Sequence, residues 1–165
     1  MVGLAVAKGH LDVLQWAKDE GSEWVMARDL CPIAAEFGHR HILQWFKEQA
    51  GGLGVQWSFE TSADTCAHAA FGGHLELLKW LREGGCEWDG ATCAASADGG
   101  HMEVLQWARE KGCPWDSSTC AAAASRGRLE ILKWARENGC PWDELTYLRA
   151  VEGGHRDVLE YTEGH

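Results

Sequence analysis

Cysteine and histidine are the residues of this 165-residue chain whose types could perform chemistry, since it holds seven Cys and eight His. Zinc sites and redox centres bring such residues together in short motifs such as Cys-x-x-Cys. The sequence contains no Cys-x-x-Cys and no Cys/His spacing of the zinc kind. No Ser/His/Asp or Cys/His set for nucleophilic catalysis stands out either. We therefore expect a non-enzymatic protein with no metal site and no cofactor.

The histidines recur at a fixed position. Each of six glycines is followed directly by His or Arg, and the last three intervals between these glycines are 27 residues long. A residue that recurs in five of six units is typical of structure rather than of one catalytic site, so we interpret this column as a polar group that closes a turn between helices. The pairs are Gly9-His10, Gly38-His39, Gly73-His74, Gly100-His101, Gly127-Arg128 and Gly154-His155.

The cysteines also form two columns. Neighbouring helices pack about 8–10 Å apart, whereas a disulfide needs Cα atoms about 4.4–6.8 Å apart. Bridges within one column are therefore not expected, and free buried thiols are typical of a reducing, intracellular compartment. One column holds Cys86, Cys113 and Cys140, and the other holds Cys31, Cys66, Cys93 and Cys120.

All ten tryptophans belong to two further columns with the same period. One column lies six residues after the His or Arg, as Trp107 does, and the other lies in the following loop, as Trp115 does. A strict column is a packing pattern, so we expect these rings to fill the space between consecutive long helices. The alternative is an exposed aromatic ladder that binds a ligand.

The residues from 116 to 142 show the elements that position these columns. Asp116 is a good N-cap for a short Ala-rich helix that ends at Gly127. Residues 129–137 have the apolar spacing of an amphipathic helix, with Lys133, Arg136 and Glu137 on the solvated face. Gly139 follows its C-terminus. Each unit is therefore predicted to be a helix–turn–helix.

These residues resemble the ankyrin-repeat family in a short Trp-rich form of 27 residues, as in giant-virus and protist proteins. Ala123-Ala124 and Gly127 match the family's Ala-Ala-x-x-Gly. The loop from Gly139 to Thr146 is too short for a full β-hairpin. The resemblance implies an all-α fold, an α-solenoid of about six helix–turn–helix ankyrin-like repeats with reduced or absent β-hairpins. Residues 1–165 would form one array, with units of approximately 1–24, 25–57, 58–88, 89–115, 116–142 and 143–165.

Composition narrows the classes of partner. The net charge of −10 argues against sequence-independent nucleic-acid binding, which needs a basic surface. No apolar run reaches the roughly 18–20 residues of a membrane span, so no membrane insertion is expected. We expect a protein partner of unknown identity.

The resemblance implies binding through the concave groove lined by the short inner helices, at positions that vary between units. Phe37 and Phe71 are the best candidates for exposed anchors, although both could instead fill gaps made by nearby insertions. The loop from Glu48 to Trp57 is a second irregular feature. The candidate partner-binding residues are Ile33, Glu36, Phe37, His68, Phe71, Asp98, Ser125, Arg126, Arg149 and Glu152.

The two ends of the sequence differ. Leu4 and Val6 lack polar cover, whereas the last unit is more polar, with Arg149 and Arg156 in place of neutral residues. Terminal repeats need polar outer faces. We therefore expect the N-terminal end to be covered by further sequence or by another subunit. The alternative function is a structural, scaffold subunit of a larger assembly or a part of a larger chain.

Overall fold

The computed structural model of the chain describes residues 2–20, 27–52 and 63–164, and these residues form twelve α-helices and no strand. Trp24 and Trp57 lie outside the described residues, as does the second half of the Glu48–Trp57 segment, whose first half is helical rather than a loop. The helices are α1 (Val2–Lys8), α2 (Leu11–Asp19), α3 (Ala27–Glu36), α4 (Arg40–Gly52), α5 (Ala63–Phe71), α6 (Leu75–Glu83), α7 (Gly90–Gly99), α8 (Met102–Glu110), α9 (Ser117–Ser125), α10 (Leu129–Glu137), α11 (Glu144–Gly153) and α12 (Arg156–Glu163).

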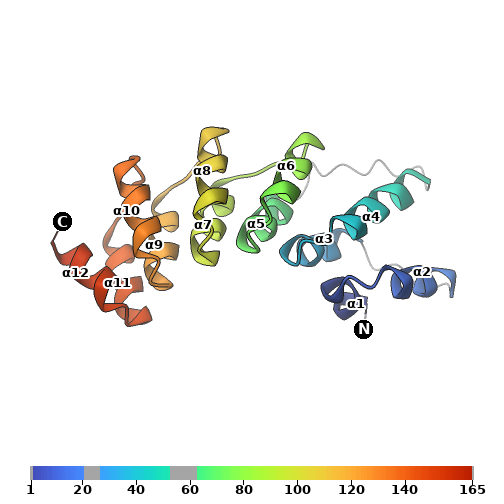
Figure 1. The fold of residues 1–165 in the computed structure, drawn as a ribbon, viewed down its shortest axis with the longest axis horizontal. Coiled ribbons are helices and arrows are strands. Elements are labelled where there is room, and N and C mark those ends of the chain that lie inside the picture. Colours follow the sequence, from blue (N-terminus) through green and yellow to red (C-terminus); the bar gives the residue numbers. More distant parts are fainter. Residues whose placement is uncertain (1, 21–26, 53–62, 165) are drawn as a thin grey trace.

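The helices are arranged in pairs along an arch (Figure 1). Each odd-numbered helix contacts the even-numbered helix that follows it and also the next odd-numbered helix. The odd-numbered helices lie on the inner side of the arch and the even-numbered helices on the outer side. We call them the inner and outer helices. The prediction of an all-α, repeat-like fold is confirmed.

Small side chains allow the inner helices to approach one another. Ala97, Ala123 and Ala124 are fully buried, and the outer helices bury Leu105 and Leu132 against them. Two clusters of buried residues fill the space between the two rows of helices, and both are packed against Trp88 and Trp107 at their border.

Aspartate starts the later inner helices, as predicted. The backbone N–H of Ser118 donates to Asp116 Oδ1 at 2.9 Å, and Asp89 and Asp143 cap α7 and α11 in the same way. The hydrogen bonds from Ser118 lower the pKa of Asp116 below its usual range. The capping oxygen satisfies one of the otherwise free N–H groups of the first turn.

The histidine column closes the turns between helices through its backbone N–H groups, and its side chains also join neighbouring units. His39 Nε2 lies 3.1 Å from the carbonyl oxygen of Ala7, and His74 Nε2 lies 2.9 Å from that of Glu36. A carbonyl oxygen only accepts, so Nε2 carries the proton that is donated. Each bond ties the start of an outer helix to the end of the preceding unit's inner helix.

The same histidine rings occupy the space beside the turn glycines. Gly38 has a φ of +73°, and a Cβ placed there would lie 2.7 Å from His74 Cε1. An L-residue disfavours this left-handed conformation, and the ring of the next unit occupies the space of its side chain. Glycine is therefore required twice over at this position.

The tryptophan columns meet in pairs. The loop ring of one unit packs edge-on against the helix ring of the next, with centroids 5.6 Å apart for Trp88 and Trp107 and 5.8 Å apart for Trp115 and Trp134. These rings are half-buried against the core clusters. The prediction of a packing role therefore agrees with the later units. Trp16 is the exception, since 61% of it is exposed.

A row of arginines covers the loop rings. The guanidinium carbon of Arg82 lies 4.2 Å from the centroid of Trp88, and Arg109 lies over Trp115 at 4.1 Å. Arg136, predicted on the solvated face, is partly exposed and lies over Trp142 at 4.3 Å. The flat guanidinium of Arg is weakly hydrated, so it packs favourably on an aromatic face, and the aliphatic stem packs there with it.

The two ends of the array are less different than predicted. Leu4 is 66% exposed, as expected for an end without polar cover, but Val6 is fully buried. At the other end, α11 exposes four large apolar side chains despite the polar residues nearby. They are Leu145, Tyr147, Leu148 and Val151.

Candidate protein-binding surface

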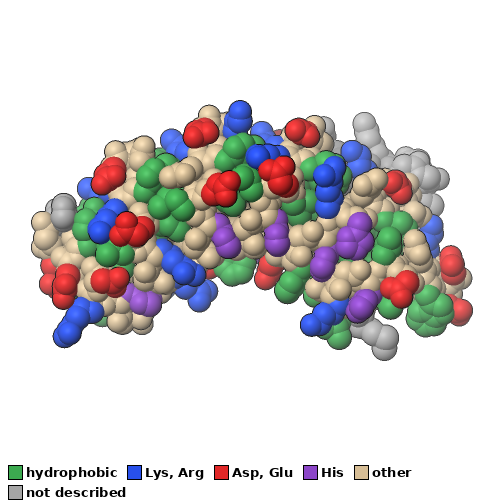
Figure 2. Space-filling view, viewed as in Figure 1, with side chains coloured by type: hydrophobic (Ala, Val, Ile, Leu, Met, Phe, Trp, Pro, Cys, Tyr) green, Lys and Arg blue, Asp and Glu red, His purple; other side chains and the backbone are tan. Residues whose placement is uncertain are grey.

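The predicted partner-binding residues lie on the inner helices or directly after them. Ile33 and Glu36 belong to α3, His68 and Phe71 to α5, Asp98 to α7, Ser125 to α9, and Arg149 and Glu152 to α11, while Phe37 and Arg126 follow α3 and α9. The outline of the molecule is hollowed on the side of the inner helices (Figure 2). Several His side chains lie one after another along the length of the molecule. We call the row formed by these residues the inner-helix surface.

Glu36 and His68 connect the first two of these helices. Glu36 Oε2 lies 2.9 Å from His68 Nδ1, and both side chains are partly exposed. The backbone carbonyl of Glu36 also accepts the hydrogen bond from His74. The side chain of Glu36 is thus held in place by its neighbour while remaining accessible to a ligand.

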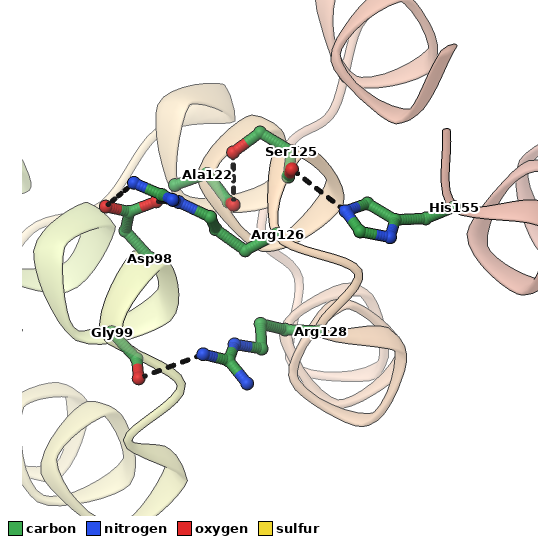
Figure 3. Close-up of polar contacts among 7 residues, drawn as sticks. All are labelled: Asp98, Gly99, Ala122, Ser125, Arg126, Arg128 and His155. Carbon is green, nitrogen blue, oxygen red and sulfur yellow. Dashed lines mark hydrogen bonds and ion pairs between the residues drawn. The ribbon is translucent and has the colours of Figure 1, made fainter. Parts of the chain in front are cut away.

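Asp98 and Arg126 form the equivalent link between α7 and α9 (Figure 3). Arg126 Nε donates to Asp98 Oδ1 at 2.7 Å, and a second nitrogen lies 3.4 Å from Oδ2. The Asp98 carboxylate raises the pKa of the Arg126 guanidinium above its usual value. This two-point geometry fixes the plane of the guanidinium, whose side chain remains 58% exposed.

Ser125 has its polar groups engaged within the scaffold (Figure 3). Its hydroxyl donates to the carbonyl oxygen of Ala122 at 2.9 Å, and its own carbonyl accepts from His155 Nε2 at 3.1 Å. Arg128 lies in the histidine column and donates to the carbonyl oxygen of Gly99 at 3.4 Å. Of these residues, Ser125 contributes to the joint between units more than to a binding surface.

The apolar candidates separate into core and surface. Ile33 is packed against the core cluster, with its Cδ1 facing Gly3 of α1. Phe71 is half-buried. Phe37 is 50% exposed and stacks on His39, with ring centroids 6.4 Å apart. Phe37 is therefore the best-presented aromatic side chain of the inner-helix surface.

Arg149 and Glu152 pair with each other on α11, where Nη1 and Oε2 lie 2.8 Å apart. Both are exposed. The inner-helix surface therefore presents three acid–base pairs in sequence, flanked by one exposed aromatic ring. Such a row can form hydrogen bonds and ion pairs with an extended peptide or with a loop of another protein.

Two features of the sequence pointed to contacts that the sequence analysis missed. An arginine stands six residues before the loop Trp in three consecutive units, which is the signal for the stacking of Arg82, Arg109 and Arg136. Cysteines of different columns stand 20 residues apart, which places Cys66 beside Cys86.

Comparisons with known proteins leave the family open: no family model matches the chain, and no curated protein matches it significantly. Within the described ranges, no three or more His, Cys, Asp or Glu side chains are grouped so as to hold a metal ion. Across those same ranges, every helix is too short or too polar to cross a membrane.

Proposed function

We propose that the chain is a solenoid of six ankyrin-like repeats with reduced hairpins, and that it is a non-enzymatic module that binds a protein partner through the inner-helix surface. The observation that carries the proposal is the side-by-side contact of successive inner helices on the inner side of an arch. This contact brings the positions that vary between units into one row. The Gly-His turns, the Ala-rich inner helices and the absence of strands from the described ranges support the ankyrin-like assignment.

Charge and aromatic content support a protein partner. Glu36 is paired with His68 and Asp98 with Arg126, and a row of paired polar groups selects a partner by complementarity rather than by net attraction. Phe37 provides a rigid ring with a small loss of side-chain entropy on binding. The net charge of −10 disfavours nucleic acid as the ligand.

Site-specific photo-crosslinking tests this proposal. A benzophenone amino acid replaces Phe37 or Arg126 on the inner-helix surface, and Glu130 on the outer face, whose side chain is 81% exposed, serves as the matched control. The proposal expects one protein to be captured from cells at the two inner positions and not at position 130. Capture confined to position 130 would contradict it.

A structural role in a larger assembly is the second candidate, and the exposed apolar side chains of α11 favour it. Leu145, Leu148 and Val151 are each about half exposed, as in an interface that awaits another chain. Sedimentation over a range of concentrations distinguishes the two functions. An assembly subunit self-associates, and Leu148→Glu restores the monomer, whereas an isolated binding module is monomeric throughout.

A further inference from the structure

Three consecutive units each bury a pair of cysteines from different columns. The first member lies in the inner helix and the second lies directly after the outer helix of the same unit, 20 residues later. All six are buried, and no disulfide joins them. The pairs are Cys66 and Cys86, Cys93 and Cys113, and Cys120 and Cys140.

The sulfur atoms of the first pair touch. Cys66 Sγ donates to Cys86 Sγ at 3.0 Å. The second and third pairs have the same spacing along the chain, and each earlier thiol lies close enough to the later one for its pKa to be affected. Since a disulfide bond is about 2.05 Å long, the sulfurs of the first pair need to approach by only about 1 Å.

The two cysteines of a pair differ in environment. In the second and third pairs the later cysteine donates its own S–H to a backbone carbonyl, that of Asp89 from Cys113 and that of Asp116 from Cys140, at 3.3 Å in both cases. The later sulfur is thus the acceptor of the thiol–thiol hydrogen bond. Each chain of hydrogen bonds therefore runs from the earlier cysteine to the later cysteine and on to the backbone carbonyl.

A guanidinium lies beside each later cysteine. Arg82 and Arg109 donate to the carbonyl oxygens of Cys86 and Cys113. The bond from Cys66, together with the charge of Arg82, lowers the pKa of the Cys86 thiol, whereas burial and the same bond raise the pKa of Cys66. The later cysteine of each pair is therefore the one whose pKa is lowered and whose thiolate forms more readily.

We propose that the three pairs are sites of reversible oxidation, each closing to an intramolecular disulfide by exchange with a small-molecule disulfide. The thiolate of the later cysteine attacks one sulfur of the oxidant and forms a mixed disulfide, and the first thiolate of the oxidant leaves. The earlier cysteine then gives up its proton and attacks the mixed disulfide, and the second thiolate leaves. The oxidant gains two electrons and the two protons, and one S–S bond forms in the protein.

Each bond would join an inner helix to the loop that follows its own outer helix. The bonds therefore lie within units, and the contacts between units stay non-covalent. Position 51, which lies 20 residues after Cys31, is Gly51, so the proposal assigns no disulfide to Cys31. Oxidation would stiffen units three to five one by one and leave the joints of the array free to adjust.

Mass spectrometry of the folded, full chain tests the proposal. The protein is incubated with excess oxidised glutathione, and the remaining thiols are alkylated. We expect alkylation to fall from seven cysteines to one, and the mass before alkylation to fall by about 6 Da, since each disulfide removes two hydrogens. Reduction with dithiothreitol should restore all seven thiols. Seven alkylated cysteines after oxidation, or glutathione retained on the protein, would overturn the proposal.

The connectivity is the sharper readout. Cleavage at Asp and Glu separates Cys86 from Cys93 and Cys113 from Cys120, because Glu87, Asp89 and Asp116 lie between them. Three cross-linked peptide pairs with the native spacing of 20 residues are expected. Other pairings would refute the proposal.

Two controls separate structure from chance encounter. In chain unfolded with denaturant, Cys86 and Cys93 are only seven residues apart and should pair more often than the native partners, because short loops close more readily. Identical pairing in folded and unfolded chain would overturn the proposal.

Cys93→Ser should leave two alkylatable thiols, Cys31 and Cys113, and the other two disulfides intact. Pairing of Cys113 with a new cysteine in this variant would also count against it.

Discussion

Replacing Gly38 by alanine tests whether the histidine column holds the units together. The new Cβ would meet the ring of His74 at 2.7–3.0 Å, on a residue whose φ is +73°. The left-handed backbone costs alanine about 1–2 kcal/mol, and displacing a packed ring adds about 1–3 kcal/mol. We therefore expect Gly38→Ala to lower the free energy of unfolding by about 2–5 kcal/mol.

The chain offers a matched control for this substitution. Gly154 occupies the same turn position with a φ of +67°, and a Cβ there would meet nothing within 4 Å. Gly154→Ala should therefore cost only the backbone contribution of about 1–2 kcal/mol. In a His74→Ala background the cost of Gly38→Ala should fall to a similar value, which makes the coupling between positions 38 and 74 about 1–3 kcal/mol.

Urea unfolding followed by circular dichroism measures all four variants, and unchanged slopes against urea show that each one alters stability rather than compactness. Equal losses for Gly38→Ala and Gly154→Ala, with no coupling to His74, would refute the role assigned to the inter-unit contact.

Three further predictions concern packing, capping and binding. Trp107→Ala should destabilise the protein by about 3 kcal/mol by leaving a cavity beside Trp88, whereas Trp16→Ala should cost less than about 1 kcal/mol; equal shifts in melting temperature would contradict this. Asp116→Ala should cost about 1 kcal/mol at pH 7. The pKa of Asp116 is lowered by folding, so its contribution is present above the unfolded pKa and lost as pH falls through the folded one. The variant and the wild type should therefore converge in stability once the pH lies below the folded pKa of Asp116, as measured by urea unfolding. Arg126→Glu should leave the melting temperature nearly unchanged and weaken partner capture at position 37, and undiminished capture would contradict its role in binding.

Local signals in the sequence predicted the helices well. Asp116 caps α9 because a short side-chain acceptor before an Ala-rich run satisfies N–H groups of that same run, and no distant residue is needed. Gly127 and Gly139 have positive φ for the same local reason. The 27-residue period then fixes where each unit repeats.

Contacts between units were less predictable. His74 reaches a carbonyl 38 residues earlier in the chain, and a turn-closing role within one unit fits its sequence neighbours equally well. The stacking of Arg136 on Trp142 was not predicted for the same reason, because an amphipathic pattern identifies the buried stripe but not which charged residue packs on a ring in the next loop.

The position of the inner-helix surface was predicted from the sequence, but the pairing of its side chains was not. The ten predicted residues do lie on the inner helices or directly after them. Their pairing depends on the register between helices, which the insertions in the early units obscure, so the Glu36–His68 contact could not be read from spacing. Ile33 is partly buried against the core cluster and faces Gly3 of α1.

The joints between units give the array a mechanical property. Successive units contact mainly their immediate neighbours, so tension along the arch would load one joint after another in series. When a unit detaches, its carbonyl–histidine hydrogen bond and its edge-on ring pair break, while the next joint stays intact. Each release of 27 residues would lengthen the chain by up to about 90 Å. Under force the protein would unfold stepwise, with equal steps from the later units, whose period is 27 residues.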